Sequence, residues 1–179
     1  NAVFFEQIGK VSATGVTLGC GQDAQGRPIF CPSTLVTREQ MAAFIIRALG
    51  DFNPPTPAQQ RFVDVPSGSA FYSFIEQMAV RGITLGCDTN GPLYCPTGNV
   101  TREQMAAFII RALGQFNPPT PPQQRFTDVP PSNPFYAFID QMAVLGITLG
   151  CDAQGTLYCP GNVVTREQMS AFLVRAFGL

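Results

Sequence analysis

The six cysteines of this chain are the residues whose spacing first suggests chemistry. Six cysteines can pair in many ways, but these sit in a sequence unit that recurs, and a recurring unit favours the pairing that it can make alone. We therefore predict three local disulfides, each giving about 2–3 kcal/mol under the chain-entropy model, and an oxidising location outside the cytosol. The predicted pairs are Cys20 with Cys31, Cys87 with Cys95, and Cys151 with Cys159.

A metal site is the alternative interpretation of the cysteines. Zinc ligands usually come as Cys-x2–4-Cys together with histidine or a second cysteine pair. Here the spacing is Cys-x7-Cys or Cys-x10-Cys and the chain has no histidine. Three pairs also do not divide into sites of four ligands. Disulfides are therefore favoured, and no metal or other cofactor is expected.

A second group of candidate residues is the motif Thr-Arg-Glu-Gln, which occurs three times at the start of an apolar segment with helical period. The threonine and the glutamine match a T-x-x-Q capping box, which predicts that each helix begins here. The arginine then takes the first helical position, where the helix dipole disfavours a cation by about 0.3–1 kcal/mol. The motif residues are Thr37, Arg38, Glu39 and Gln40; Thr101, Arg102, Glu103 and Gln104; and Thr165, Arg166, Glu167 and Gln168.

Two kinds of interaction could offset the unfavourable position of the arginine. An acidic sugar substituent could be held by the guanidinium and by the free N–H groups of the helix start. Alternatively, the arginine could form an internal ion pair with Asp64, Asp128 or a neighbouring glutamate, and the sequence favours this second interpretation. A glycan role for Arg102 predicts that Arg102→Ala weakens binding and leaves the melting temperature nearly unchanged; an internal role predicts a loss of stability.

Both sets of residues belong to a repeated unit. VTREQMAAFIIRALG occurs at residues 36–50 and again at 100–114, and VTREQMSAFLVRAFG occurs at 164–178. A Phe-x-Asp-Val segment opens the second and third units at 62–65 and 126–129 and has no counterpart in the first. Such repeats usually bury their apolar faces against their neighbours. The expected organisation is repeat 1 at 1–50, a Pro-rich linker at 51–61, repeat 2 at 62–114, a second linker at 115–125, and repeat 3 at 126–179.

Each repeat reads as a helix, a cysteine-stapled loop and a second helix. In the first helix, apolar residues fall at spacings of four and three and form one stripe, and we expect this stripe to be buried. The second helix should bury Met105, Phe108, Ile109 and Ala112 and end at Gly114, while the proline-rich linkers should run extended. The stripe residues are Phe71, Ile75, Met78, Phe135, Ile139 and Met142.

Composition excludes several classes of function. A net charge of −1 argues against a nucleic-acid partner held by phosphate neutralisation, and no apolar run approaches the ~18 residues of a membrane span. We expect no enzyme, because the chain has no histidine, no nucleophile beside a base and no glycine-rich phosphate loop. Asn1 does not begin a signal peptide, from which we expect a processed or truncated start.

The unit from Phe62 to Gly114 resembles an S-layer homology (SLH) domain of the cysteine-containing kind. The likeness lies in the Phe-x-Asp-Val opening, a first helix ending in Gly-Ile, a turn with glycine, an aromatic residue and proline, and a Thr-Arg-Ala-Glu-type motif opening the second helix. Here that motif reads Thr-Arg-Glu-Gln, and Ala70 or Pro134 fills the place of a usual tryptophan. The resemblance covers nearly the whole chain.

The resemblance implies a mainly α, three-pronged module with three tandem helix-loop-helix repeats around a pseudo-threefold axis. The first helices would form a central bundle, and the second helices would line grooves that bind an anionic, often pyruvylated, cell-envelope polysaccharide. That would make the chain an extracellular anchor at the bacterial cell surface. The carried-over binding residues are Arg38, Glu39, Gln40, Arg102, Glu103, Gln104, Arg166, Glu167 and Gln168.

A structural role is the second interpretation. The chain shows only repeats and no cargo sequence, which also fits a subunit that assembles with copies of itself into an extracellular filament or surface layer. Repeat 1 lacks a Phe-x-Asp-Val segment, so its helix pair should have an uncovered apolar place where another chain or further residues could pack.

Overall fold

The computed structural model describes residues 3–88 and 92–179, and this part of the chain is mainly α-helical, as expected. Two short strands, β1 (Gly21–Gln22) and β2 (Pro28–Ile29), pair antiparallel in the longer cysteine loop of repeat 1. No helix in these residues is both long enough and apolar enough to cross a membrane. The described residues form the helices α1 (Phe5–Ala13), α2 (Arg38–Ala48), α3 (Tyr72–Val80), α4 (Arg102–Ala112), α5 (Tyr136–Val144) and α6 (Arg166–Phe177).

The second helix of every repeat begins at its predicted capping box. The hydroxyl of Thr101 accepts a hydrogen bond from the backbone N–H of Gln104, and the Gln104 side chain accepts one from the backbone N–H of Thr101. Thr37 with Gln40 and Thr165 with Gln168 repeat the arrangement. This local code therefore fixes the start of α2, α4 and α6.

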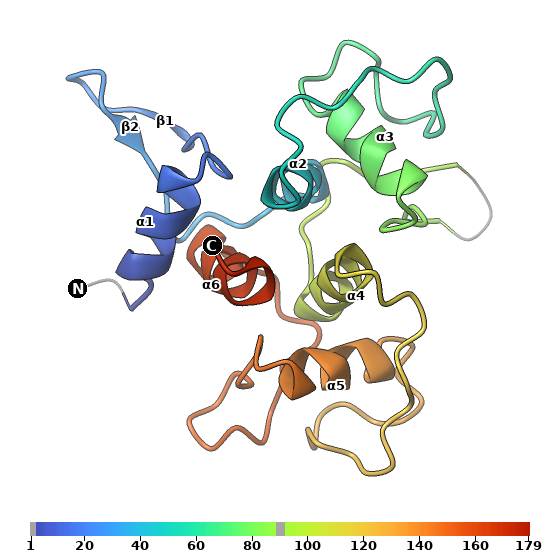
Figure 1. The fold of residues 1–179 in the computed structure, drawn as a ribbon. Coiled ribbons are helices and arrows are strands. Elements are labelled where there is room, and N and C mark those ends of the chain that lie inside the picture. Colours follow the sequence, from blue (N-terminus) through green and yellow to red (C-terminus); the bar gives the residue numbers. More distant parts are fainter. Residues whose placement is uncertain (1–2, 89–91) are drawn as a thin grey trace.

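The helices pair between repeats. The first helix of one repeat packs on the second helix of another: α3 on α2, α5 on α4, and α1 on α6. In Figure 1 the second helices α2, α4 and α6 lie in the middle, and α1, α3 and α5 lie outside them. The expectation that the first helices form the central bundle is therefore wrong. Buried residues on several faces of α2, α4 and α6, such as Ala42, Phe44 and Ile46 on α2, suit a helix with neighbours on more than one side.

A ring of backbone hydrogen bonds joins the segments that lead into the second helices. The N–H of Val36 donates to the carbonyl oxygen of Val164 at 2.9 Å, Val164 donates to Val100 at 3.0 Å, and Val100 donates to Val36 at 3.0 Å. All three valine side chains are fully buried. Their extended backbones can therefore satisfy one another without water.

The apolar core agrees with most of the predicted stripe. Ile75, Met78, Ile139 and Met142 are buried, and so are Met105, Phe108 and Ile109 on α4. Phe71, Phe135 and Ala112 are only partly buried and pack against the edge of the core. The two phenylalanines occupy the N-cap positions of α3 and α5, where the end of the helix faces a surface groove.

The two linkers contain no helix, as predicted, and they dock on the repeats. An ion pair of 3.0 Å joins Asp51 in the first linker to Arg81 at the end of α3. Phe116 in the second linker lies so close to Gly82 that a Cβ there would stand 3.2 Å from its ring. Gly82 also has a φ of +69°, so glycine suits this turn for both reasons.

Candidate functional site

All six cysteines form the predicted disulfides within repeats. The Cα atoms are 6.1 Å apart in the Cys20–Cys31 pair, 5.9 Å in Cys87–Cys95 and 6.0 Å in Cys151–Cys159. The zinc interpretation is therefore wrong for the cysteines, because a bonded sulfur offers no thiolate. Disulfides persist in oxidising compartments, which is consistent with a secreted protein.

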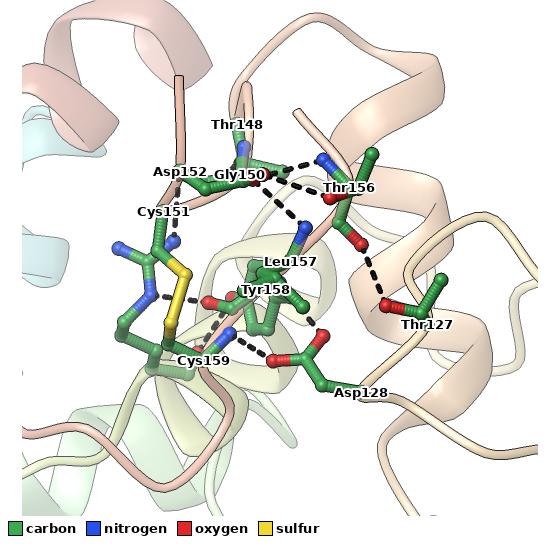
Figure 2. Close-up of a disulfide and its surroundings, with 11 residues drawn as sticks. Thr127, Asp128, Thr148, Gly150, Cys151, Asp152, Thr156, Leu157, Tyr158 and Cys159 are labelled. Atoms are coloured by element: carbon green, nitrogen blue, oxygen red, sulfur yellow. Dashed lines mark hydrogen bonds between the residues drawn. A yellow bond between two sulfur atoms is a disulfide. The ribbon is translucent and has the colours of Figure 1, made fainter. Parts of the chain in front are cut away.

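The aspartates of the Phe-x-Asp-Val segments accept hydrogen bonds from the disulfide-closed loops. The carboxylate of Asp128 accepts hydrogen bonds from the backbone N–H groups of Tyr158 at 2.8 Å and Cys159 at 2.7 Å, beside the Cys151–Cys159 disulfide (Figure 2). Asp64 makes the same two bonds in repeat 2. These aspartates therefore hold turns, and the second cysteine of each loop adopts a positive φ.

The arginine of the motif is buried against carbonyl oxygens and aromatic rings. The Nε atom of Arg38 donates to the carbonyl oxygen of Tyr94 at 2.7 Å, and a terminal nitrogen donates to that of Gly86 at 3.1 Å. The guanidinium also lies 4.8 Å from the centre of the Tyr94 ring and 5.3 Å from that of Phe108. Only 5% of Arg38 is exposed, and burial lowers the pKa of its guanidinium.

Arg102 and Arg166 have the same kind of surroundings. Arg102 donates to the carbonyl oxygens of Tyr158 and Gly150, and Arg166 donates to the carbonyl oxygen of Phe30 and the hydroxyl of Thr17. Neither Asp64 nor Asp128 lies within ion-pair distance of these arginines. The predicted internal ion pair with Asp64 or Asp128 is therefore wrong. Carbonyl oxygens and ring faces contact the guanidinium groups, and Asp64 and Asp128 act on Arg38 and Arg102 only from beyond ion-pair distance.

The N–H groups at the start of the second helices are already bonded. Arg38 donates its backbone N–H to Gly98, and Glu39 donates to Pro96, both carbonyls from the loop of the next repeat. The equivalent bonds recur at the start of α4 and α6. The expectation that free helix N–H groups help to hold an acidic ligand is therefore wrong.

Three surface grooves lie beside the motif arginines. Each groove is bounded by the buried arginine of one repeat and by the segment around the first cysteine and the second helix of another repeat. Arg38 faces repeat 2, Arg102 faces repeat 3, and Arg166 faces repeat 1. We name each groove by its two arginines. The volumes are about 690 Å³ for the Arg38–Arg111 groove, about 430 Å³ for the Arg102–Arg175 groove and about 260 Å³ for the Arg166–Arg47 groove.

The grooves share one set of lining positions. In the Arg38–Arg111 groove, Gln104, Phe108 and Arg111 line the wall on α4, and Phe135 closes one end. These positions repeat in the other two grooves, with Gln168, Phe172, Arg175 and Phe4 in one and Gln40, Phe44, Arg47 and Phe71 in the other. The spacing of these residues along each second helix, three, four and seven apart, places them on one face.

The second arginine of each groove was not identified from the sequence. Arg47 and Arg111 lie over the rings of Phe74 and Phe138 at 4.8 and 4.9 Å, and partial burial lowers the pKa of both guanidiniums. Arg175 is exposed and donates to the carbonyl oxygen of Ile147. The sequence signal that could have identified it is an arginine seven residues after the glutamine of each motif, which places both side chains on one face of the helix.

The glutamines and the glutamates of the motif lie in different surroundings. Gln40, Gln104 and Gln168 line grooves, with their side-chain oxygens engaged in the capping boxes. Glu39, Glu103 and Glu167 do not line any of the three grooves. Glu103 instead accepts a hydrogen bond of 3.0 Å from the Asn133 side chain, and burial raises the pKa of Glu39.

Comparison with known proteins gives no relative from which a function could be transferred. Neither a protein-family model nor a curated protein sequence matches the chain. The chemistry of the grooves is therefore the ground for assigning a function.

Proposed function

We propose that this chain is a non-enzymatic, extracellular module of the SLH kind that binds an anionic cell-envelope polysaccharide and holds protein at a bacterial cell surface. In this proposal the three repeats surround a pseudo-threefold axis as three prongs. The interlocked helix pairs, the valine ring and the recurring lining of the grooves support that arrangement.

The observation that carries the proposal is the pair of arginines in every groove. The ion pairs found among the described residues are made by Lys10, Arg27, Arg81 and Arg125, none of which lines these three grooves. A guanidinium is a planar fork that matches a carboxylate with two parallel hydrogen bonds. In each groove the outer arginine can make such a pair, and the buried arginine adds a second positive charge, which together suit a chain of sugars that bears carboxylates.

The two arginines have different tasks in this proposal. The buried arginine, such as Arg38, is fixed by its carbonyl partners and presents a positive charge at the base of the groove. The outer arginine, such as Arg111, is held on a ring face and can turn its remaining N–H groups toward a ligand. Phe135 offers an apolar end, and the largest groove, at about 690 Å³, falls within the usual ~300–1,000 Å³ of ligand sites.

Binding to a pyruvylated polysaccharide and to its chemically depyruvylated form tests the proposal. The chain should bind the pyruvylated polymer and lose most of that binding when the pyruvate carboxylates are removed, because the arginines recognise the charge. Binding should also weaken as salt rises. Equal binding to both polymers, or to neither, would contradict the proposal.

A matched pair of triple variants separates groove binding from net charge. Arg47→Ala, Arg111→Ala and Arg175→Ala together should weaken binding by about a hundredfold, if each of the three lost contacts contributes about 1 kcal/mol. The control removes the same charge outside the grooves, with Arg27→Ala, Arg61→Ala and Arg125→Ala. Equal losses in the two variants would show that overall charge, not the grooves, attracts the polymer.

A subunit that assembles with copies of itself is the second candidate function. One observation favours it: Ile8 and Phe30 in repeat 1 are half-exposed, whereas their counterparts in repeats 2 and 3 are buried. Concentration-dependent light scattering of the purified chain tests this candidate, since a subunit should grow in mass and an anchor should stay monodisperse.

A further inference from the structure

A leucine lines each of the three arginine grooves and stays mostly exposed to solvent. Leu18 is 73% exposed, Leu85 75% and Leu149 71%. Among the described residues, no other large apolar side chain that is more than half exposed occupies one position in all three repeats; the exposed Val80, for example, corresponds to Ala13. Single exposed apolar residues are common on protein surfaces, but one that recurs in every groove needs a specific explanation.

The backbone holds each leucine in a fixed turn. In repeat 2 the hydroxyl of the buried Thr84 accepts a hydrogen bond of 3.2 Å from the N–H of Gly86, on the other side of Leu85. Gly86 has a φ of +94°, and a Cβ there would stand 2.5 Å from the carbonyl oxygen of Leu93, so only glycine fits. The same Thr-Leu-Gly turn occurs in repeats 1 and 3. Each leucine is therefore already positioned before a ligand arrives, which lowers the entropic cost of contact.

Each leucine also lies next to the buried arginine of its groove. Arg38 donates a hydrogen bond of 3.1 Å to the carbonyl oxygen of Gly86, directly after Leu85. A ligand that reaches the buried arginine therefore comes close to the leucine as well. The arginines of the other two grooves likewise donate to a neighbour of the leucine, Arg102 to Gly150 beside Leu149 and Arg166 to Thr17 beside Leu18.

A cation beside an exposed apolar side chain suits a ligand group that carries a carboxylate and a methyl group together. A pyruvate ketal has both on one carbon atom. A hexuronic acid has the carboxylate but offers hydroxyl groups where the ketal has its methyl. Against a leucine the methyl gains from burial, whereas a hydroxyl loses hydrogen bonds to water. The two classes of acidic sugar should therefore differ in affinity because of the leucine.

Building on the proposed function, we propose that Leu18, Leu85 and Leu149 make the three grooves selective for pyruvate ketals over uronic acids. The arginines recognise the carboxylate, which both kinds of sugar have. The leucines contact the methyl group, which only the ketal has. Attraction of the anion and discrimination between anions thus belong to different side chains of the same groove.

The experiment compares two small ligands, a methyl glycoside that carries a pyruvate ketal and the methyl glycoside of a hexuronic acid. Both are titrated into the chain, and the leucine methyl signals are followed by NMR. The pyruvylated sugar should bind about fourfold more tightly in each groove, the gain from one buried methyl group, and should shift the methyl signals of all three leucines. Equal affinities, or leucine signals that do not move while the sugar binds, would overturn the inference and leave the proposed function standing. If neither sugar binds, the proposed function fails and the inference fails with it.

A triple leucine variant and a matched valine variant locate the selectivity. The leucine variant should bind the pyruvylated sugar only about as well as the uronic acid, and its affinity for the uronic acid should stay nearly unchanged. The valine variant removes exposed apolar side chains that line none of the three grooves, and it should keep the native preference. An equal loss of both sugars in the leucine variant would mean that the leucines contact the sugar ring, which overturns their assignment to the methyl group. The substitutions are Leu18→Ala, Leu85→Ala and Leu149→Ala in the first variant and Val63→Ala, Val80→Ala and Val144→Ala in the second.

A single substitution tests whether the effect is local to one groove. In Leu85→Ala the methyl signals of Leu18 and Leu149 should still respond to the pyruvylated sugar as they do in the native chain, because each leucine lines a different groove. The Arg111 side-chain signals should then titrate at about fourfold higher concentration of this sugar than in the native chain. A weaker response in all three grooves would contradict the assignment, since the loss would not come from the contact at Leu85.

Discussion

The side-chain hydroxyl of Ser170 donates a hydrogen bond of 3.0 Å to the carbonyl oxygen of Arg166. In the other two repeats, the equivalent carbonyls of Arg38 and Arg102 accept instead from the hydroxyls of Tyr94 and Tyr158, both at 2.7 Å. Repeat 1 has Phe30 where the others have tyrosine, and α6 has Ser170 where α2 and α4 have alanine. The serine in α6 therefore compensates for the tyrosine hydroxyl that repeat 1 lacks, because each donates to the same buried carbonyl oxygen.

This compensation predicts non-additive stability changes. Ser170→Ala should destabilise the fold by about 1 kcal/mol, because the buried carbonyl loses its side-chain donor. Adding Phe30→Tyr should recover much of that loss by restoring the arrangement of the other repeats. Chemical denaturation of the two single variants and the double variant measures the coupling; strictly additive changes would show that the two residues do not substitute for one another.

Replacing a motif arginine should reduce stability directly. Arg102→Ala leaves the carbonyl oxygens of Tyr158 and Gly150 without their donor and removes a guanidinium from two ring faces. We expect a loss of about 2–3 kcal/mol in unfolding free energy. The control, Arg61→Ala on an exposed side chain, should change stability by no more than about 0.5 kcal/mol. If Arg102→Ala leaves the melting temperature unchanged, Arg102 does not stabilise the fold, and only the ligand-binding role is left for it.

The loop of repeat 3 should weaken in acid. The backbone N–H of Leu157 and then the side chain and N–H of Thr156 hold the pKa of Asp152 below its usual 3.8 (Figure 2). A folded-state pKa below the unfolded value means that the contribution to stability is fully present above about pH 4 and is lost as pH falls through the folded-state pKa. An NMR titration of the Asp152 carboxyl should give a midpoint below 3.8.

Asp152→Asn provides the control for this titration. The variant should lose the pH-dependent change in the Leu157 amide signal, because no carboxylate remains to titrate. A midpoint at or above 3.8 in the native chain, or a Leu157 signal that still titrates in the variant, would show that the hydrogen bonds do not stabilise the charged form of Asp152.

The sequence was sufficient wherever one short segment carries the whole physical cause. A capping box needs only Thr101 and Gln104, three residues apart, so the starts of the second helices could be predicted. A disulfide between Cys87 and Cys95 needs only a short loop, so the pairing followed from the repeat. The buried stripe containing Ile75 and Met78 followed from helical period, and the prolines kept helix out of the linkers.

The tertiary structure decided everything that depends on which repeat supplies a neighbour. A helical stripe predicts a buried face but not its partner, and here α3 packs on α2 of the preceding repeat, so the order of inner and outer helices was mispredicted. For the same reason the partner of Arg38 could not be read from its own segment: the carbonyl oxygens of Gly86 and Tyr94 come from the next repeat. A carbonyl group is present in every residue and leaves no mark in the sequence, whereas a carboxylate does, and that is why an ion pair was expected where backbone dipoles and ring faces hold the charge.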